Sequence, residues 1–184
     1  MYKHFRACTT MPHNFPPQHL HPTHTTWHIT FGTYGTRLHG GTRPNVDKQH
    51  NERGTEFVPP IVEREDSARG RMKFPPRFLT DEQRKLIELE LPEICTRGGW
   101  LYRVCSAAAD HVHLLCDIVR EVHGEKVRRL AKRWLGQALS ERWPIPAGAS
   151  WWAEEGSNVA IHDVPYLNNA FSYIARQRTI VWTP

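Results

Sequence analysis

The residues best suited to chemistry are two histidines separated by one residue in the stretch Asp110-His111-Val112-His113-Leu114. This stretch is rich in strand-forming residues, and successive side chains of a strand point to opposite faces. His111 and His113 would then share one face at roughly 6.5–7 Å, which lets two imidazoles reach one cation. The pair predicts a metal site, and the alternative is ring packing or solvation of two ordinary histidines.

The histidine content of the chain limits the weight of this spacing. With twelve histidines present, one His-x-His pair is expected by chance. His19-Leu20-His21 has the same spacing but lies in the proline-rich segment 1–24, where too few apolar side chains exist to offset the entropy of ordering. We expect residues 1–24 to form a disordered tail, and we exclude His19 and His21 as ligands.

A tyrosine and an amide four residues apart add to the candidate site. Tyr173 and Gln177 would lie on one face of a helix near the end of the sequence. A metal held by two imidazoles and an amide oxygen keeps positions open for phosphate oxygens and can polarise a phosphodiester. Tyr173 would be the nucleophile. The alternative is an ordinary core or surface aromatic, and Tyr166 shares nearly the same helix face.

The elements that must position these residues come in the order strand, helix, strand, strand, helix, short strand, helix. Strands are indicated by alternation of apolar and polar residues, and helices by apolar side chains at helical intervals behind capping residues. This order predicts an α+β fold, one antiparallel sheet with helices packed on one face. The expected elements are a strand at 27–31, a helix from the Thr80 cap to Gly98-Gly99, a hairpin of strands at 100–106 and 111–118, a basic helix over about 127–139, a short apolar piece, and a helix capped by Asp163.

The length of 184 residues fits one domain at 25–184 behind the tail. The stretch from about 40 to 76 is polar and rich in Gly and Pro, which predicts a long insertion. The four cysteines form no Cys-x-x-Cys pair, so we expect reduced thiols rather than a zinc ribbon or disulfides. No run of about 18 apolar residues and no secretory signal core occurs, which predicts a cytoplasmic protein with no membrane contact.

The formal charge of +5 allows a polyanionic partner, because Lys and Arg that neutralise phosphates release counterions. Basic residues that could follow a phosphate backbone lie off the apolar stripe of the helix at 127–139, and they are Lys126, Arg128, Arg129, Lys132 and Arg133. The alternative for these residues is a solvated helix face. Trp151 or Trp152 could stack on an unpaired base, and the alternative for them is a tryptophan pair in the core.

Taken together, these motifs resemble a known family. Asp-His-Val-His-Leu-Leu at 110–115 follows a Trp-His-Ile-Thr-Phe strand and precedes a basic helix and then Tyr-Ile-Ala-Arg-Gln at 173–177. In order and spacing, residues 25–180 resemble the small single-tyrosine HUH transposases, which include the insertion-sequence-200-like enzymes and the REP-associated tyrosine transposases. The resemblance implies a ferredoxin-like, RRM-like sheet with the HUH motif on one of its strands.

The resemblance also implies a chemistry and partners. It implies Mg²⁺ or Mn²⁺ bound by His111, His113 and Gln177, and attack on DNA by Tyr173. The product would be a 5′-phosphotyrosine link with a free 3′-hydroxyl, so that a later attack can rejoin the strand. The implied substrates are single-stranded or hairpin DNA, the implied location is the bacterial cytoplasm in association with the nucleoid, and a homodimer is one assembly that the resemblance allows.

Two other functions fit part of the sequence. A non-catalytic single-stranded DNA or RNA-binding module of the same fold would share the sheet and its aromatic residues. The combination of His-x-His and Tyr-x-x-x-Gln argues against a pure binder. A phosphate-ester hydrolase that uses His113 as acid or base lacks a further histidine close in sequence and does not explain Tyr173.

Overall fold

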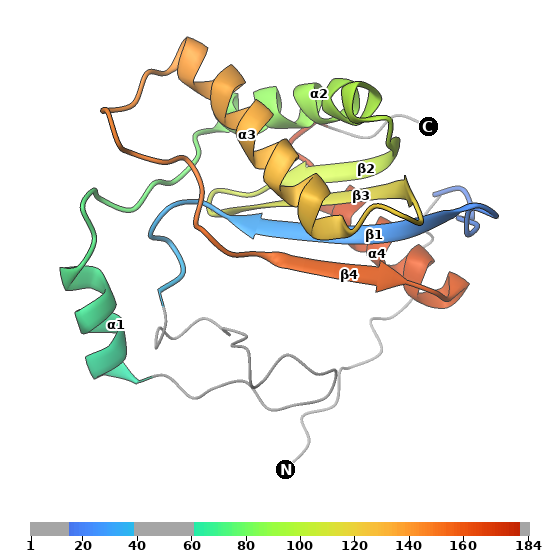
Figure 1. Ribbon diagram of the computed structural model, residues 1–184, viewed down its shortest axis with the longest axis horizontal. Helices are drawn as coiled ribbons and strands as arrows, with labels where there is room; N and C mark the ends of the chain where they lie inside the picture. The colour runs from blue at the N-terminus through green and yellow to red at the C-terminus, as the bar shows by residue number, and fades with distance from the viewer. Residues whose placement is uncertain (1–14, 39–60, 181–184) are drawn as a thin grey trace.

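Four strands and four helices make up the described part of the computed structural model, which covers residues 15–38 and 61–180 (Figure 1). The strands form a four-stranded sheet in the order β2-β3-β1-β4. The strands are β1 (His24–Gly32), β2 (Leu101–Ala107), β3 (His111–Val119) and β4 (Ser157–Ile161). The helices are α1 (Val62–Gly70), α2 (Asp81–Gly98), α3 (Gly124–Arg142) and α4 (Val164–Arg176).

The order β1-α2-β2-β3-α3-β4 is that of a ferredoxin-like fold, with α1 inserted after β1 and α4 added after β4. All strand pairs are antiparallel, and β1 pairs with β3 over its full length, from His24 opposite Val119 to Gly32 opposite His111. The predicted α+β, ferredoxin-like class is therefore confirmed. Because β1 and β3 are the two central strands, the strand that carries the histidine pair is held on both sides.

The helices cover both faces of the sheet, and the prediction that they pack on one face is wrong. Helices α2 and α3 cover one face, where Ile29 and Leu114 of the sheet are fully buried in one cluster with Leu135 of α3. Helix α4 covers the opposite face, where its Ile174 packs with Leu115 of β3 (Figure 1). The physical reason lies in the hairpin, because Leu114 and Leu115 point to opposite faces and both are apolar. Each face therefore has an apolar patch to bury.

The helix boundaries follow the capping residues as predicted. The Thr80 hydroxyl accepts the backbone N–H of Gln83, and the Gln83 side chain accepts the backbone N–H of Thr80, which completes a capping box at the start of α2. Gly99 ends that helix with φ of 70°, a left-handed conformation that favours glycine. Asp163 starts α4 by accepting the backbone N–H of Tyr166 at 2.7 Å. Local sequence thus sets where the tyrosine-bearing helix begins.

The segment before β1 is attached to the rest of the fold. The backbone N–H of Gln18 donates to the side-chain oxygen of Asn168 on α4 at 2.9 Å, and Arg103 of β2 donates to the Gln18 side chain at 3.1 Å. The prediction of a disordered tail is therefore wrong for residues 15–24. Polar side chains supply part of the contacts, and Phe15 and Leu20 pack against the apolar cluster that contains Phe171. Residues 1–14 lie outside the described residues.

The polar insertion expected at about 40–76 is described in part. Residues 39–60 lie outside the described residues. Helix α1 follows them, has no buried residue and is not predicted by the sequence, since it lacks an apolar stripe. An ion pair between Arg69 and Glu65 at 2.6 Å stabilises its last turn.

Two chain-wide predictions concern the cysteines and the membrane. Cys95, Cys105 and Cys116 are buried free thiols, which confirms the expectation for these three. Cys8 lies outside the described residues. Among the helices of residues 15–38 and 61–180, none is both long enough and apolar enough to cross a membrane.

Candidate active site

Two histidines of β3 and the tyrosine of α4 meet on the face of the sheet that α4 covers. The rings of His111 and His113 lie 4.7 Å apart between centroids and are nearly perpendicular. The ring of Tyr173 meets the His113 ring edge-on at 5.5 Å. The structure thus brings together three residues that the sequence could only group by spacing.

The His113 imidazole is buried and fixed from one side. Its Nδ1 lies 2.9 Å from the hydroxyl of Thr30 and 3.1 Å from Nε2 of His28, both on the neighbouring strand β1. Burial, together with the neighbouring His28 and His111, lowers the pKa of His113 to about 3. The ring is therefore neutral near pH 7. Its Nε2 is buried and has no hydrogen-bond partner.

His28 is a part of this site that the sequence analysis missed. Burial lowers its pKa to about 4, so it too is neutral near pH 7. The sequence does contain an indication of it, because His28 and Thr30 alternate with the core residues Trp27, Ile29 and Phe31 and therefore point away from the main core. The missing information was the pairing of β1 with β3, which places Thr30 opposite His113.

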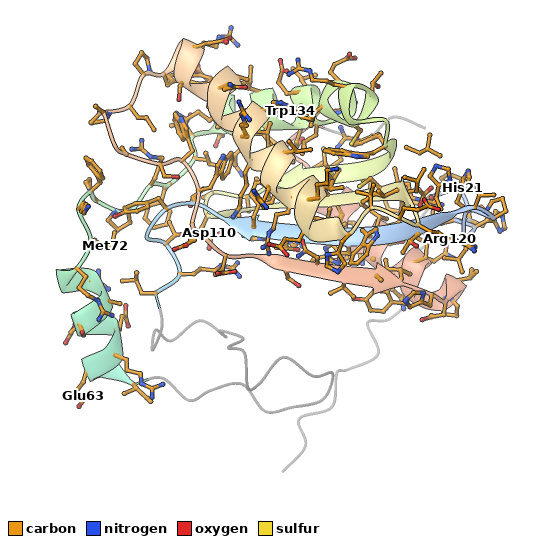
Figure 2. The ribbon with its side chains drawn as sticks, viewed as in Figure 1. His21, Glu63, Met72, Asp110, Arg120 and Trp134 are labelled. Atoms are coloured by element: carbon orange, nitrogen blue, oxygen red, sulfur yellow. The ribbon has the colours of Figure 1, made fainter. Side chains whose placement is uncertain are left out.

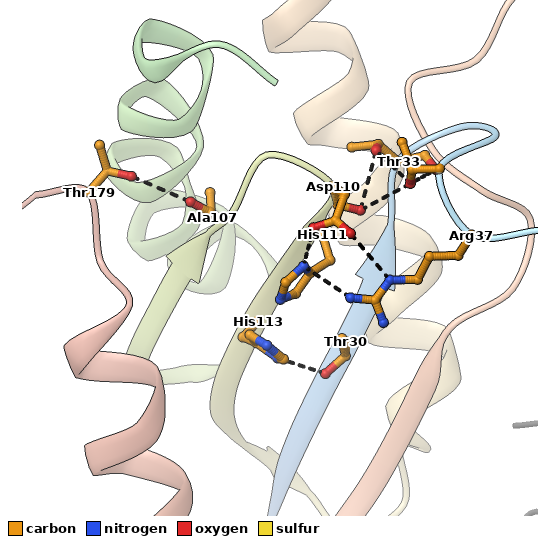
Figure 3. A network of polar contacts seen from close by, with 9 residues as sticks. Thr30, Thr33, Arg37, Ala107, Asp110, His111, His113 and Thr179 are labelled. Atoms are coloured by element: carbon orange, nitrogen blue, oxygen red, sulfur yellow. Dashed lines mark hydrogen bonds and ion pairs between the residues drawn. The ribbon is translucent and has the colours of Figure 1, made fainter. Parts of the chain in front are cut away.

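The His111 imidazole is oriented by charged neighbours. Its Nδ1 lies 2.7 Å from Oδ1 of Asp110 and 3.2 Å from Nη2 of Arg37. Arg37 in turn approaches the second oxygen of Asp110 at 3.6 Å through its Nε (Figure 3). The carboxylate at the shorter distance favours the tautomer with the proton on Nδ1. In that tautomer the Nε2 lone pair of His111 is available to a ligand.

The arrangement of the two imidazoles fits a divalent metal. Histidines that bind a metal usually donate their other ring N–H to a carboxylate or another acceptor, which fixes the tautomer. Both rings here have Nδ1 engaged, and in the tautomer with the proton on Nδ1 the buried Nε2 of His113 is an acceptor that needs a partner. Among the described residues, no three His, Cys, Asp or Glu side chains are grouped so as to hold a metal ion. The remaining ligands would have to be of another kind, such as an amide oxygen.

Tyr173 lies beside the core rather than in it. Its side chain is 47% exposed, whereas the next residue, Ile174, is fully buried. Phe171 is buried on the same helix and packs into the same apolar cluster as Ile174. The helix is thus anchored by its apolar stripe, and the tyrosine ring reaches the histidines while part of it stays open to solvent.

Gln177 stands at the C-terminal cap of α4, one residue after the helix ends, and its backbone N–H donates to the carbonyl of Ile174 at 3.0 Å. The segment after it is held by Glu88, a residue of α2 that the sequence analysis also missed. The fully buried Glu88 carboxylate accepts the backbone N–H groups of Thr179 and Ile180, each at 2.8 Å. These two hydrogen bonds tie the segment after α4 to helix α2.

The basic helix does not lie at this site. Helix α3 packs on the face opposite to α4, so the sheet separates it from the histidines (Figure 1). The Arg128 side chain is buried and donates to the carbonyl of Gly156, and the Lys132 ammonium donates to the carbonyls of residues 153–155 at 2.7–2.9 Å. The prediction that these two residues follow a phosphate backbone is therefore wrong. Exposed residues of the same predicted set are Lys126, Arg129 and Arg133.

Trp152 is a core residue, so the prediction that it stacks on a base is also wrong. Only 7% of its surface is exposed. Its ring meets Phe31 edge-on at 5.0 Å, and its indole N–H donates to the carbonyl of Lys132 at 2.8 Å. Trp151 is buried as well. The alternative of a core tryptophan pair holds.

His19 and His21 have partners away from the candidate site. His21 lies at the opposite end of the sheet from Asp110 (Figure 2). Its ring packs against that of His24 at 4.1 Å. The carbonyl of His19 accepts a hydrogen bond from Arg103 at 2.7 Å. This agrees with their exclusion as partners of the pair on β3.

Fold and side chains together define a ferredoxin-like α+β protein that presents a His-x-His pair beside a half-exposed tyrosine. No protein-family model matches the chain, and no curated protein gives a significant match. Among solved structures, the chain is similar to the crystal structure of a putative transposase from Deinococcus radiodurans R1. The two share 14% sequence identity with a TM-score of 0.45, and the similarity covers 89% of this chain and 98% of that chain.

Proposed function

We propose that this protein cuts single-stranded DNA with Tyr173 and transfers the strand through a 5′-phosphotyrosine intermediate, as in the single-tyrosine HUH transposases that its motifs resemble. One observation carries the proposal. The buried Nε2 of His113 has no hydrogen-bond partner, and the ring of Tyr173 lies 5.5 Å away between centroids. A vacant ligand atom beside a solvent-accessible phenol is the arrangement that metal-assisted attack on a phosphodiester requires.

His111 and His113 would hold Mg²⁺ or Mn²⁺ through their Nε2 atoms, with the amide oxygen of Gln177 as a further ligand. When bound, the ion would act as a Lewis acid on the phosphodiester. The protein prepares both ligands in advance. Asp110 and Thr30 are placed to accept the Nδ1 protons of the two rings, and in that tautomer both Nε2 lone pairs would be available to the ion.

Tyr173 would form a new bond from its phenol oxygen to phosphorus while the bond from phosphorus to the 3′-oxygen breaks. The phenol proton passes to water, which reaches this side chain because 47% of it is exposed. The departing 3′-oxygen takes up a proton and becomes a hydroxyl. Since one phosphodiester replaces another, the 3′-hydroxyl of a second strand can later attack the link and rejoin DNA.

The substrate would be single-stranded DNA next to a hairpin. Tyr173 must approach phosphorus in line with the leaving oxygen, and an unpaired strand can turn its backbone toward the helix surface. In a duplex, base pairing holds both backbones in a fixed helical path, so the phosphodiester cannot turn in this way. Unpaired flanks therefore suit this site better than a plain duplex.

The competing binding-module function is disfavoured by the layers of the fold. Binding modules with this sheet stack bases on aromatic side chains of an open sheet face. Here α2 and α3 cover one face and α4 packs on the other (Figure 1). Helix α4 packs mainly on β2 and β3 of that face. The rest of the face carries His28 and Thr30 of β1 and Ser157 and Val159 of β4, none of which is a Phe, Tyr or Trp on which a base could stack.

The test is formation of a covalent adduct. The full chain is incubated with labelled single-stranded hairpins and Mn²⁺, and adducts that survive denaturation are mapped to the tyrosine. We expect adducts with wild-type protein, none with Tyr173→Phe, and undiminished yield with Tyr166→Phe, a matched control on the same helix. Removing only the phenol oxygen leaves the ring packing intact, so the inactive variant should still fold and bind Mn²⁺.

Three outcomes would contradict the proposal. The first is binding of hairpins with no adduct from the wild type, which would indicate a binding module. The second is survival of the adduct in Tyr173→Phe with its loss in Tyr166→Phe, which would move the nucleophile one heptad back. The third is tighter binding to plain duplex than to a hairpin with single-stranded flanks.

A further inference from the structure

Arg37 places a guanidinium directly beside the histidine pair. It belongs to the segment that follows β1, and Figure 3 shows its side chain extending to His111 and Asp110. Its Nη2 lies 3.2 Å from Nδ1 of His111, and its Nε lies 3.6 Å from Oδ2 of Asp110. About a third of the side chain, 35%, is exposed. The group is therefore held at the site and still open to a ligand.

The contact between Arg37 and His111 conflicts with metal binding by the histidine. A ring that binds a metal through Nε2 carries its proton on Nδ1, and Asp110 at 2.7 Å accepts that proton. Nδ1 then has no lone pair left for a second donor. In the metal-binding tautomer, the Nη2 hydrogen of Arg37 faces another N–H and needs a different acceptor.

The segment that carries Arg37 is fixed to the turn that carries Asp110. The carbonyl of Asp110 accepts the backbone N–H of Thr33 at 2.9 Å and the Thr33 hydroxyl at 3.2 Å. The Thr36 hydroxyl donates to the Thr33 carbonyl at 3.0 Å. The guanidinium is thus oriented before any ligand arrives, which reduces the entropy lost on binding.

We infer that Arg37 binds a non-bridging oxygen of the phosphodiester that is cleaved at the histidine pair, an inference that rests on the proposed function. A guanidinium donates through a planar fork that matches phosphate geometry, and it stays charged at every working pH. The phosphate oxygen supplies the acceptor that Nη2 loses when His111 takes the metal-binding tautomer. Asp110 then serves two partners, because it orients His111 through one oxygen and Arg37 through the other.

Two buried or half-buried arginines of the sheet and of α3 are already engaged elsewhere. Arg103 pairs with the buried Asp117 at 2.8 Å and also donates to the carbonyl of His19. The buried Arg128 lies across the sheet and donates to the carbonyl of Gly156. Neither can reach a phosphate at the histidines without breaking these contacts.

The test uses Arg37→Gln, which keeps most of the length and polarity of the side chain but removes the charge. Arg142→Gln, an exposed residue at the end of α3 and outside the predicted DNA-binding set, is the matched control. On hairpin DNA with Mn²⁺, Arg37→Gln should form the adduct about tenfold more slowly or worse, as for a lost charged hydrogen bond, whereas Arg142→Gln should match the wild type. Mn²⁺ affinity measured by calorimetry should be unchanged or higher, because a positive charge near the ion is removed.

A second measurement identifies the atom that Arg37 contacts. In a Tyr173→Phe background, DNA with a neutral methylphosphonate at the cleaved linkage is compared with ordinary DNA. Arg37→Gln should weaken binding of ordinary DNA about tenfold and binding of the methylphosphonate DNA less than about twofold, because the partner charge is already absent.

Failure of this inference and failure of the proposed function give different results. No adduct from the wild type refutes the proposed function. An adduct from the wild type with an unchanged rate in Arg37→Gln overturns the role of Arg37. So does an equal loss on both DNAs, or a matching loss of Mn²⁺ affinity, because either result would mean that Arg37 only orients Asp110 and His111.

Discussion

The proposed metal site would depend on a carboxylate that need not touch the metal, and Asp110→Asn isolates its contribution. The Oδ1 atom of Asp110 lies 2.7 Å from Nδ1 of His111, and the side chain is only 11% exposed. Asparagine keeps the size of the side chain. It also keeps the backbone carbonyl that accepts the N–H of Thr33 at 2.9 Å, so the turn before β3 should survive. The substitution therefore changes charge and hydrogen bonding while the fold stays in place.

The expected size of the effect follows from these contacts. A hydrogen bond to a charged group contributes about 1.5–3 kcal/mol, and one between neutral groups about 0.5–1.5 kcal/mol. Replacing the carboxylate should thus weaken Mn²⁺ binding by about 1–2 kcal/mol, or roughly 5- to 30-fold. If the asparagine amide instead turns its NH₂ group to His111, the ring takes the other tautomer and loses its Nε2 lone pair. The loss should then reach the upper end of the range of about 10–100-fold found for such partners.

Calorimetric titration with Mn²⁺ measures this change, with thermal unfolding of the metal-free protein to confirm that the fold is intact. A variant with both His19→Ala and His21→Ala is the control for general loss of histidines, and it should bind Mn²⁺ like the wild type. Equal affinity of Asp110→Asn and wild type would refute the reasoning, because His111 could not then bind through Nε2 with Asp110 behind it. A loss in the His19 and His21 variant equal to that of Asp110→Asn would remove the argument from strand geometry.

Two further predictions concern stability. Burial lowers the pKa of His28 to about 4 and of His113 to about 3, so below the ordinary value of about 6.5 the unfolded chain takes up protons that the native protein does not. As the pH is lowered from about 6.5 to 4, the free energy of unfolding of the metal-free protein should therefore fall by on the order of 1.4 kcal/mol per group and pH unit. Urea unfolding in the presence of EDTA measures this free energy. A free energy of unfolding that rises as the pH is lowered would contradict the prediction. Glu88→Gln replaces a fully buried carboxylate that accepts the N–H groups of Ala107, Thr179 and Ile180, so we expect a loss of about 2–4 kcal/mol in urea unfolding. Wild-type stability of that variant would mean that the end of α4 is held by other contacts.

Much of the fold follows from local patterns. The capping box at Thr80, the glycine that ends α2 and the aspartate that starts α4 each act through neighbouring backbone groups, so sequence alone predicts them. The histidine strand is also local, because alternation fixes which side chains share a face. Spacing within one element was therefore a sound guide to that element.

Contacts between distant elements were not predictable in the same way. His28 and Thr30 reach His113 only because β1 pairs with β3 in one register, and a shift by one residue would turn both side chains to the other face. Lys132 has a charged head that a helical wheel places in solvent, yet three backbone carbonyls before β4 surround it. Such a carbonyl cluster exists only after the chain has folded back on itself, so no window of sequence around Lys132 indicates it.

The position of α4 links the error about the fold to the candidate site. Val112 and Leu114 face the core beneath α2 and α3, so His111 and His113 must face the other way. A tyrosine on a helix of that same core would be separated from them by the sheet, about 10 Å thick with its side chains. Pairing Tyr173 with the histidines was therefore incompatible with placing all helices on one face. The two predictions could not both hold, and the apolar contact between Leu115 and Ile174 decides between them, because it draws α4 to the face where the imidazoles lie.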